Sequence, residues 1–216
     1  MIKDLILQDN TNQRLPCVVL LDGSTSMDGK AIDNLNQGLS ILERELKADD
    51  VASLRVQLLL LRIGGHSDVE ILTDWTDAID FSAPQVEANG TTPLGEGVNV
   101  ALRELEEQKK KYRQNQITYN RPWLFIITDG APTDMNWEKA AEKAVEAEKK
   151  GKVVVFPIGT EEADFEILNK FSSRGAIMLN NLDFKELFVW LSQSVSAGSQ
   201  TEINSETQLP AISWGA

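Results

Sequence analysis

Short apolar runs alternate along the chain with longer stretches whose apolar positions recur every three or four residues. Continuous apolar runs at residues 16–21, 56–63 and 123–127 predict strands that are buried on both faces, as in a parallel sheet. The spacing of apolar residues over 28–47 and 93–112 predicts two helices, each with a single buried stripe. Pro93 suits the start of the second helix, where its missing N–H costs nothing.

The same alternation continues to the end of the chain. We expect a helix at 136–150, a strand at 153–157 with a turn at Gly159, a short helix at 163–171, a strand at 176–179 and a final helix at 184–195. Residues 69–72 follow a turn at Gly64 and Gly65 and predict a return strand. Together these elements predict an α/β fold: a doubly wound, mostly parallel sheet with one antiparallel edge strand and helices on both faces.

The 216 residues suit one domain, with 1–14 as a polar lead, 15–195 as the folded domain and 196–216 as a polar tail. The tail is rich in Ser, Gly, Gln, Asn and Thr and has no periodicity, so we expect it to be mobile or docked as an extended segment. Its Trp214 is a candidate anchor for a partner protein.

Composition narrows the function. The chain has 33 acidic and 21 basic residues, a formal charge of -12, which disfavours binding to a phosphate backbone, so we expect no nucleic-acid partner. No apolar run approaches the length of a membrane span and residues 1–14 lack a signal-peptide core, so we expect a cytoplasmic protein without a membrane partner. The single histidine, His66, and the single cysteine, Cys17, leave little material for a catalytic triad or a zinc site.

Polar side chains follow the predicted strands where a doubly wound sheet binds its ligands. Asp22, Ser24 and Ser26 follow the first strand, Asp129 follows the strand at 123–127, and a threonine of the Asn89–Thr92 loop precedes a helix. Each group alone is typical of a helix cap or a turn. Together they offer two carboxylates and several hydroxyls without thiolate or imidazole, a donor set that favours Mg²⁺ held partly through water, with Mn²⁺ or Ca²⁺ possible.

These residues resemble a known family. Asp22-Gly23-Ser24-Thr25-Ser26, Gly90-Thr91-Thr92-Pro93-Leu94 and Thr128-Asp129-Gly130, in that order, are similar to the metal-ion-dependent adhesion site of von Willebrand factor A domains. The resemblance implies that Ser24 and Ser26 bind the metal directly and that Asp22 and Asp129 act mainly through water. It also implies direct ligation by a threonine when a partner is bound; Thr92 is our choice and Thr91 the alternative.

The Ser26-Met27-Asp28-Gly29 continuation and the Pro-Leu pair after Thr92 look most like bacterial cytoplasmic A-domain proteins of the tellurium-resistance and stress type. That resemblance implies a scaffold that works with a serine/threonine kinase or a phosphatase. Three positions depart from the family pattern: Thr25 stands where glycine is usual, Gly23 is smaller than usual, and Arg62-Ile63-Gly64-Gly65 replaces an aromatic-glycine ending. The last departure puts in doubt any ligand role for that turn.

The function expected from these features is a protein-binding module, not an enzyme, in which Mg²⁺ bridges to an acidic residue of a partner protein. The alternative is a Mg²⁺-dependent phosphatase or phosphotransferase using the same loop, although Ser24 stands where that class needs a second aspartate. Six acidic residues and no basic one lie between 66 and 90, which predicts either a solvated face or an acidic rim beside the threonine loop: Asp68, Glu70, Asp74, Asp77, Asp80 and Glu87.

Overall fold

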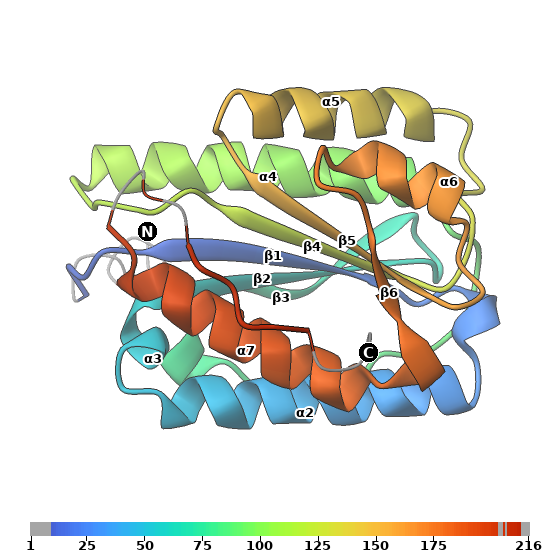
Figure 1. Ribbon diagram of the computed structural model, residues 1–216, viewed down its shortest axis with the longest axis horizontal. Coiled ribbons are helices and arrows are strands. Elements are labelled where there is room, and N and C mark those ends of the chain that lie inside the picture. The colour runs from blue at the N-terminus through green and yellow to red at the C-terminus, as the bar shows by residue number, and fades with distance from the viewer. Residues whose placement is uncertain (1–9, 203–204, 206, 213–216) are drawn as a thin grey trace.

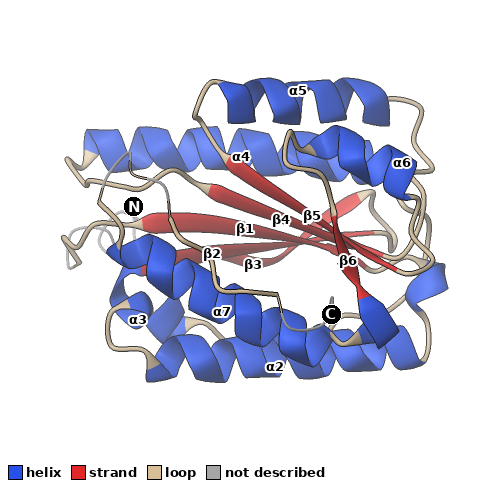
Figure 2. Ribbon diagram, viewed as in Figure 1, coloured by secondary structure: helices blue, strands red, loops and turns tan. Residues whose placement is uncertain are grey.

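The computed structural model describes residues 10–202, 205 and 207–212. A six-stranded sheet with the order β3-β2-β1-β4-β5-β6 forms its middle layer, and helices cover both faces (Figures 1 and 2). β3 pairs antiparallel with β2 and every other pairing is parallel. The predicted fold class is therefore confirmed. The strands are β1 Leu15–Asp22, β2 Val56–Ile63, β3 Val69–Asp77, β4 Trp123–Thr128, β5 Val154–Thr160 and β6 Ile177–Leu179.

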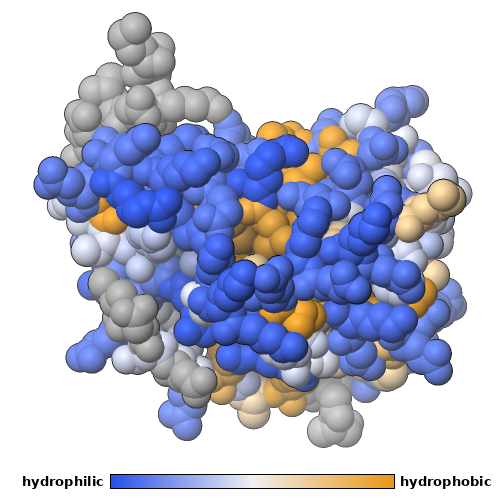
Figure 3. All heavy atoms as spheres, turned by 90° about the horizontal axis from the view of Figure 1, so that it is seen from above, coloured by the Kyte–Doolittle hydropathy of each residue, from blue (hydrophilic) through white to orange (hydrophobic). Residues whose placement is uncertain are grey.

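Two apolar cores form because side chains of the central strand alternate between the faces. Cys17, Val19 and Leu21 of β1 pack toward α2 and α7, whereas Val18 and Leu20 pack toward α4 and α5. The helices are α2 Lys30–Ala48, α3 Ala52–Arg55, α4 Leu94–Gln114, α5 Trp137–Lys149, α6 Phe165–Leu168 and α7 Phe184–Gln200, with 3₁₀ turns at Thr25–Met27, Ala78–Asp80, Asn169–Phe171 and Asn180–Leu182. None of the helices in the described part of the chain has the length and apolarity to cross a membrane. Hydrophilic residues dominate the face seen from the side of α4 and α5, with hydrophobic ones showing between them (Figure 3).

Three predicted boundaries were wrong, and tertiary packing explains two of them. α7 continues to Gln200 instead of ending at 195, because Gly198 lies flush against Trp123, where a Cβ would approach the ring to 2.8 Å. β5 runs through Gly159 to Thr160, since that glycine provides room for Leu168 rather than a turn. β3 extends from 72 to Asp77 along β2.

Arg14, predicted as the last residue of a polar lead, is completely buried and forms an ion pair of 2.9 Å with Asp77. Asp77 therefore belongs to the interior, and the acidic rim expected between 66 and 90 loses one member. The other five carboxylates, at 68, 70, 74, 80 and 87, are exposed.

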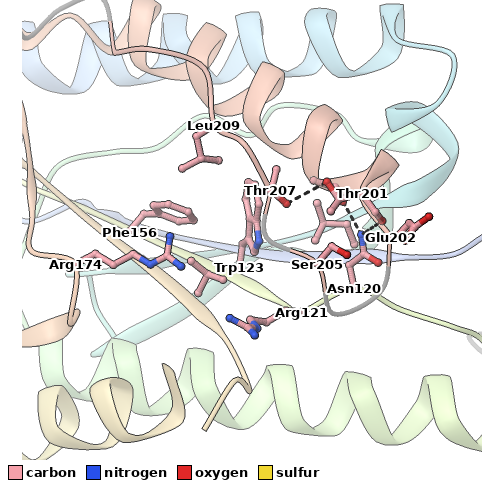
Figure 4. Close-up of a pocket in the computed structure, with 13 residues that line it drawn as sticks. Asn120, Arg121, Trp123, Phe156, Arg174, Thr201, Glu202, Ser205, Thr207 and Leu209 are labelled. Carbon is pink, nitrogen blue, oxygen red and sulfur yellow. Dashed lines mark hydrogen bonds between the residues drawn. The ribbon is translucent and has the colours of Figure 1, made fainter. Parts of the chain in front are cut away.

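The described part of the tail lies against the domain in extended form. Leu209 packs on the α2 and α7 core, and the indole N–H of Trp190 donates to the Pro210 carbonyl at 3.0 Å. Thr207 donates to Thr201 at 3.2 Å beside a pocket of about 270 Å³ at the amino ends of β1, β4 and β5 (Figure 4). Of the two expectations for the tail, docking therefore describes these residues. Trp214 lies outside the described residues.

Candidate metal site

The predicted metal residues gather where the sheet changes winding direction. β1 and β4 are neighbours, but the helix after β1 packs on one face and the helix after β4 on the other. Open α/β sheets bind ligands in the crevice at this point, outside the carboxyl ends of the strands. Asp22 ends β1 and Asp129 directly follows β4, so the topology brings both carboxylates to that crevice.

Asp22 is fully buried and has only neutral hydrogen-bond partners. One carboxylate oxygen accepts from the backbone N–H of Ser24 at 2.9 Å, and the other accepts from the Thr128 hydroxyl. Burial raises the pKa of Asp22 above its ordinary value, and these hydrogen bonds oppose the rise. The loop geometry thus fixes the carboxylate in place without neutralising it.

A chain of hydrogen bonds connects the remaining residues of the first loop to Asp129. The Ser24 and Ser26 hydroxyls lie 3.0 Å apart, and Ser26 donates to Asp129 at 2.9 Å. Burial, followed by the negative charge of Asp22, raises the pKa of Asp129. In the described part of the chain neither carboxylate forms an ion pair, so the two acidic groups lie near each other without a basic side chain to balance them.

Thr92 faces this group, whereas Thr91 is exposed. A Cβ built on Gly130 would lie 3.8 Å from the Ser26 hydroxyl and 3.8 Å from the Thr92 hydroxyl, so the two oxygens border the same small space. Thr92 is 5% exposed, and its backbone N–H donates to the Thr133 hydroxyl at 3.1 Å. Thr91 instead lines an open groove beside Pro93. The geometry favours Thr92 over Thr91, and the assignment of either as a ligand stays a prediction.

The donor set fits a hard divalent cation. The structure brings together two carboxylates and three hydroxyls, all oxygen, and hydrogen bonds join Ser24 to Ser26 and Ser26 to Asp129. Among the described residues no group of three or more His, Cys, Asp and Glu side chains has the geometry of a metal cluster. The site therefore suits Mg²⁺ with several waters better than Zn²⁺ or a tight Ca²⁺ cage.

Three residues that shape the site have no role predicted from the sequence pattern. Thr128 orients Asp22, and its position in the Thr-Asp-Gly motif was the one available signal. Thr133 and Asp134 hold the start of α4, since Asp134 accepts from the Gly95 N–H at 3.1 Å. Nothing in the local pattern distinguishes these two from ordinary loop residues.

Comparison with known proteins adds a family to this geometry. A family model described as von Willebrand factor type A domain matches residues 17–190. A search of curated proteins found no match.

Several solved structures share the fold at low sequence identity. The ArnB paralog VWA2 from Sulfolobus acidocaldarius aligns with a TM-score of 0.57 and 18% identity over 85% of this chain and 46% of that one. The vWF domain of the type V pili tip protein Mfa5 from Porphyromonas gingivalis gives 0.64 and 11% over 90% and 99%. The pilus adhesin SpaC from Lactobacillus rhamnosus GG gives 0.70 and 13% over 87% and 31%. The chain thus spans less than half of the first and third of these structures.

Proposed function

The chain belongs to the von Willebrand factor type A domain family, and from this premise we propose that it is a metal-dependent protein-binding module. Asp22, Ser24, Ser26, Thr92 and Asp129 would hold Mg²⁺, which would give the site an attachment point for a carboxylate of a partner protein. Domains of this family are commonly interaction modules, which agrees with the proposal.

The observation that carries the proposal is the pair of carboxylates, Asp22 bonded to the Ser24 backbone N–H and Asp129 to the Ser26 hydroxyl, without a basic partner in the described chain. A divalent cation would stabilise both ionised carboxylates, whose pKa burial now raises. When bound, the ion supplies a Lewis-acidic centre that attracts anionic oxygens. The hydroxyls of Ser24 and Ser26 would turn their lone pairs to it in place of the hydrogen bonds they now exchange.

The surroundings suit an approaching protein. Ser26 is exposed, so the site can be reached from solvent. Beside it an open groove of about 610 Å³ is lined by Thr91, Pro93, Thr133 and Asp134, among others. Met135, in the same loop, is 96% exposed and offers an apolar contact at the rim. A Mg²⁺ ion held by these residues would keep several waters, and a partner carboxylate could take the place of one.

The cellular setting rests on the resemblance to bacterial tellurium-resistance and stress proteins. We therefore include a cytoplasmic serine/threonine kinase or phosphatase among the partners of this proposal. Catalysis by the chain itself is not part of it. Hydrolysis through Ser24 or Ser26 needs a base, and His66 is exposed beyond the end of β2. Phosphoryl transfer through Asp22 needs a second acid two residues later, where Ser24 stands.

Titration with Mn²⁺, followed by calorimetry or water-proton relaxation, tests the proposal. We expect wild-type affinity in the micromolar to millimolar range, roughly that of weak oxygen sites, and loss of binding in Asp22→Ala and Asp129→Ala. Asp28→Ala is the matched control, because Asp28 is an exposed acid just beyond Ser26 and its removal changes the charge equally. Equal binding by wild type and both site variants would overturn the assignment.

A further inference from the structure

Arg62, at the carboxyl end of β2, lies between two of the loops that carry the predicted metal residues. Its side chain is only 8% exposed. One terminal nitrogen donates to the Gly23 carbonyl at 3.3 Å and to the Asn89 side-chain oxygen at 2.8 Å. The other lies 3.4 Å from Glu70, which is half exposed. A single guanidinium therefore connects the Asp22–Ser26 loop with the loop that leads to Thr92.

The two loops also meet through their backbones. The Asn89 N–H donates to the Gly23 carbonyl at 2.8 Å, and the Thr25 N–H donates to the Gly90 carbonyl at 3.1 Å. The Gly23 carbonyl thus accepts from both Asn89 and Arg62. A movement of Arg62 would therefore alter the hydrogen bonds of the Gly23 carbonyl, which joins the two loops.

The reason for glycine at position 23 differs from the reason at the nearby positions 64 and 90. Gly64 and Gly90 have φ values of +92° and +78°, and a Cβ on either would meet backbone atoms within 2.7 Å. Gly23 lies outside that left-handed region, and the three atoms nearest to its Cβ would all belong to Arg62, with Nε at 2.4 Å and Cδ and Cγ at 3.0 Å. The Arg62 side chain is therefore the nearest obstacle to a larger residue at 23.

The position of Arg62 leaves one polar atom unsatisfied. Its Nε is buried and has no hydrogen-bond partner among the described residues. A buried N–H without an acceptor is unfavourable, so packing alone does not account for a guanidinium at this place. Its contacts to Gly23 and Asn89 do account for it.

We propose that Arg62 and Gly23 form one positioning unit, which holds the Asp22–Ser26 loop against residues 89–92 and thereby sets the affinity of the site for its ion. This inference rests on the proposed metal-binding function. It also connects two departures from the family pattern, because the small residue at 23 leaves the space that the arginine at 62 occupies.

A double-mutant cycle of Mn²⁺ binding tests the unit. The contacts by which the Arg62 guanidinium joins the two loops are called here the Arg62 clamp. Arg62→Ala removes this clamp and Gly23→Ala displaces it. Each variant should bind Mn²⁺ about 10-fold more weakly, which is the usual effect of losing a residue that supports a metal ligand. In Gly23→Ala/Arg62→Ala the new methyl group has room, so binding should be about as weak as in Arg62→Ala alone. Single effects that multiply to about 100-fold in the double variant would overturn the coupling.

Two further variants separate position from charge. Glu70→Gln removes only the half-exposed ion pair and should leave Mn²⁺ affinity within about twofold. Arg62→Lys keeps the charge but lacks the fixed N–H directions of the guanidinium, which lead from one terminal nitrogen to Gly23 and Asn89, so it should bind Mn²⁺ about as weakly as Arg62→Ala. Full affinity in Arg62→Lys would show that the charge acts, not the clamp.

Hydrogen exchange in metal-free protein tests the clamp without the ion. Arg62→Ala should speed exchange of the Thr25 and Asn89 amides about 10-fold and leave amides in β4 unchanged. Unchanged exchange at Thr25 and Asn89 would overturn the clamp whatever the metal data show. Wild-type protein that fails to bind Mn²⁺ would overturn the proposed function, while the exchange result would still decide the role of Arg62.

Discussion

Buried carboxylates lie at the two edges of the sheet that the strand ends form, the amino-end edge and the carboxyl-end edge of the parallel strands, and their partners differ in charge. At the end of β3, Asp77 pairs with Arg14 at 2.9 Å and accepts from Gln57 at 2.9 Å. At the opposite edge Asp22 and Asp129 have only neutral partners, and the charge of Asp22 raises the pKa of Asp129. At the first edge a basic side chain of the protein itself balances the charge of the buried carboxylate. The second lacks a positive charge among its described contacts, which is where an external cation would have most effect.

The contrast separates structural from functional burial. A buried ion pair loses stability when one partner is removed, because the other charge is left uncompensated. A cluster of like charges gains stability when one is removed, since repulsion and desolvation are relieved. The two edges should therefore respond to mutation with opposite signs.

The largest effect is expected at the Arg14 edge. Asp77→Ala leaves the fully buried Arg14 guanidinium without a counter-charge and should lower the free energy of unfolding by about 3–5 kcal/mol. Urea denaturation followed by circular dichroism measures the change. Asp80→Ala, a nearby exposed acid, is the control and should change stability by less than about 0.5 kcal/mol. A loss below about 1 kcal/mol for Asp77→Ala would remove the distinction between the edges.

Thr92→Ala should have the next largest effect, on binding rather than on stability. Loss of one metal-facing hydroxyl should weaken partner capture in Mg²⁺ about 10-fold, and EDTA should weaken it by the same order. The two treatments should not add, because both remove one bridged contact. The matched control is Thr91→Ala, at an exposed position one residue earlier. Equal capture by wild type and Thr92→Ala, in Mg²⁺ and in EDTA, would show that recognition uses another face.

A smaller effect of opposite sign is expected for Asp22→Asn. In metal-free buffer near neutral pH this neutral isostere should raise the free energy of unfolding by about 1 kcal/mol, because it removes a buried charge that has no cationic partner. Thermal unfolding in EDTA measures the gain. Destabilisation by more than about 1 kcal/mol would mean that Asp22 supports the fold itself.

The smallest effect is a pH dependence of the metal-free wild type. Because the pKa values of Asp22 and Asp129 are raised above the ordinary 3.8, the folded state holds protons more tightly than the unfolded chain. Their contribution to stability therefore falls as pH rises from 3.8 through the raised values. Mg²⁺ should oppose the fall, since it binds the ionised form. Melting curves of wild type and Asp22→Asn/Asp129→Asn at several pH values, with and without Mg²⁺, measure this contribution. The same pH dependence of melting temperature in both proteins would contradict it.

The fold was predictable because its signals are local. The β1 residues are buried on both faces, and the apolar stripe of α2 recurs every three or four positions. The placement of Asp22 and Asp129 at one edge followed from the rule that parallel strands end together. These features need only residues near one another in sequence.

The rest depended on contacts between distant side chains. Arg14 and Asp77 lie in polar stretches of the sequence, which predicts exposed side chains, yet they form a buried ion pair. Gly23 and Arg62 are separate departures in the sequence, although the close approach that connects them exists only in three dimensions. The last turn of α7 contains Gly198 and Ser199, whose burial overrides their weak helix propensity. Periodicity does not encode such pairings.

The most direct test of the account is a crystal structure of the protein grown with Mn²⁺, examined for anomalous scattering. The account predicts one anomalous peak bordered by the Ser24, Ser26 and Thr92 hydroxyls, with Asp22 and Asp129 oriented toward it. The peak should be lost in Asp22→Ala/Asp129→Ala crystals grown in the same way. Crystals without a peak in this crevice, with the Ser26 to Asp129 hydrogen bond intact, would contradict the central claim.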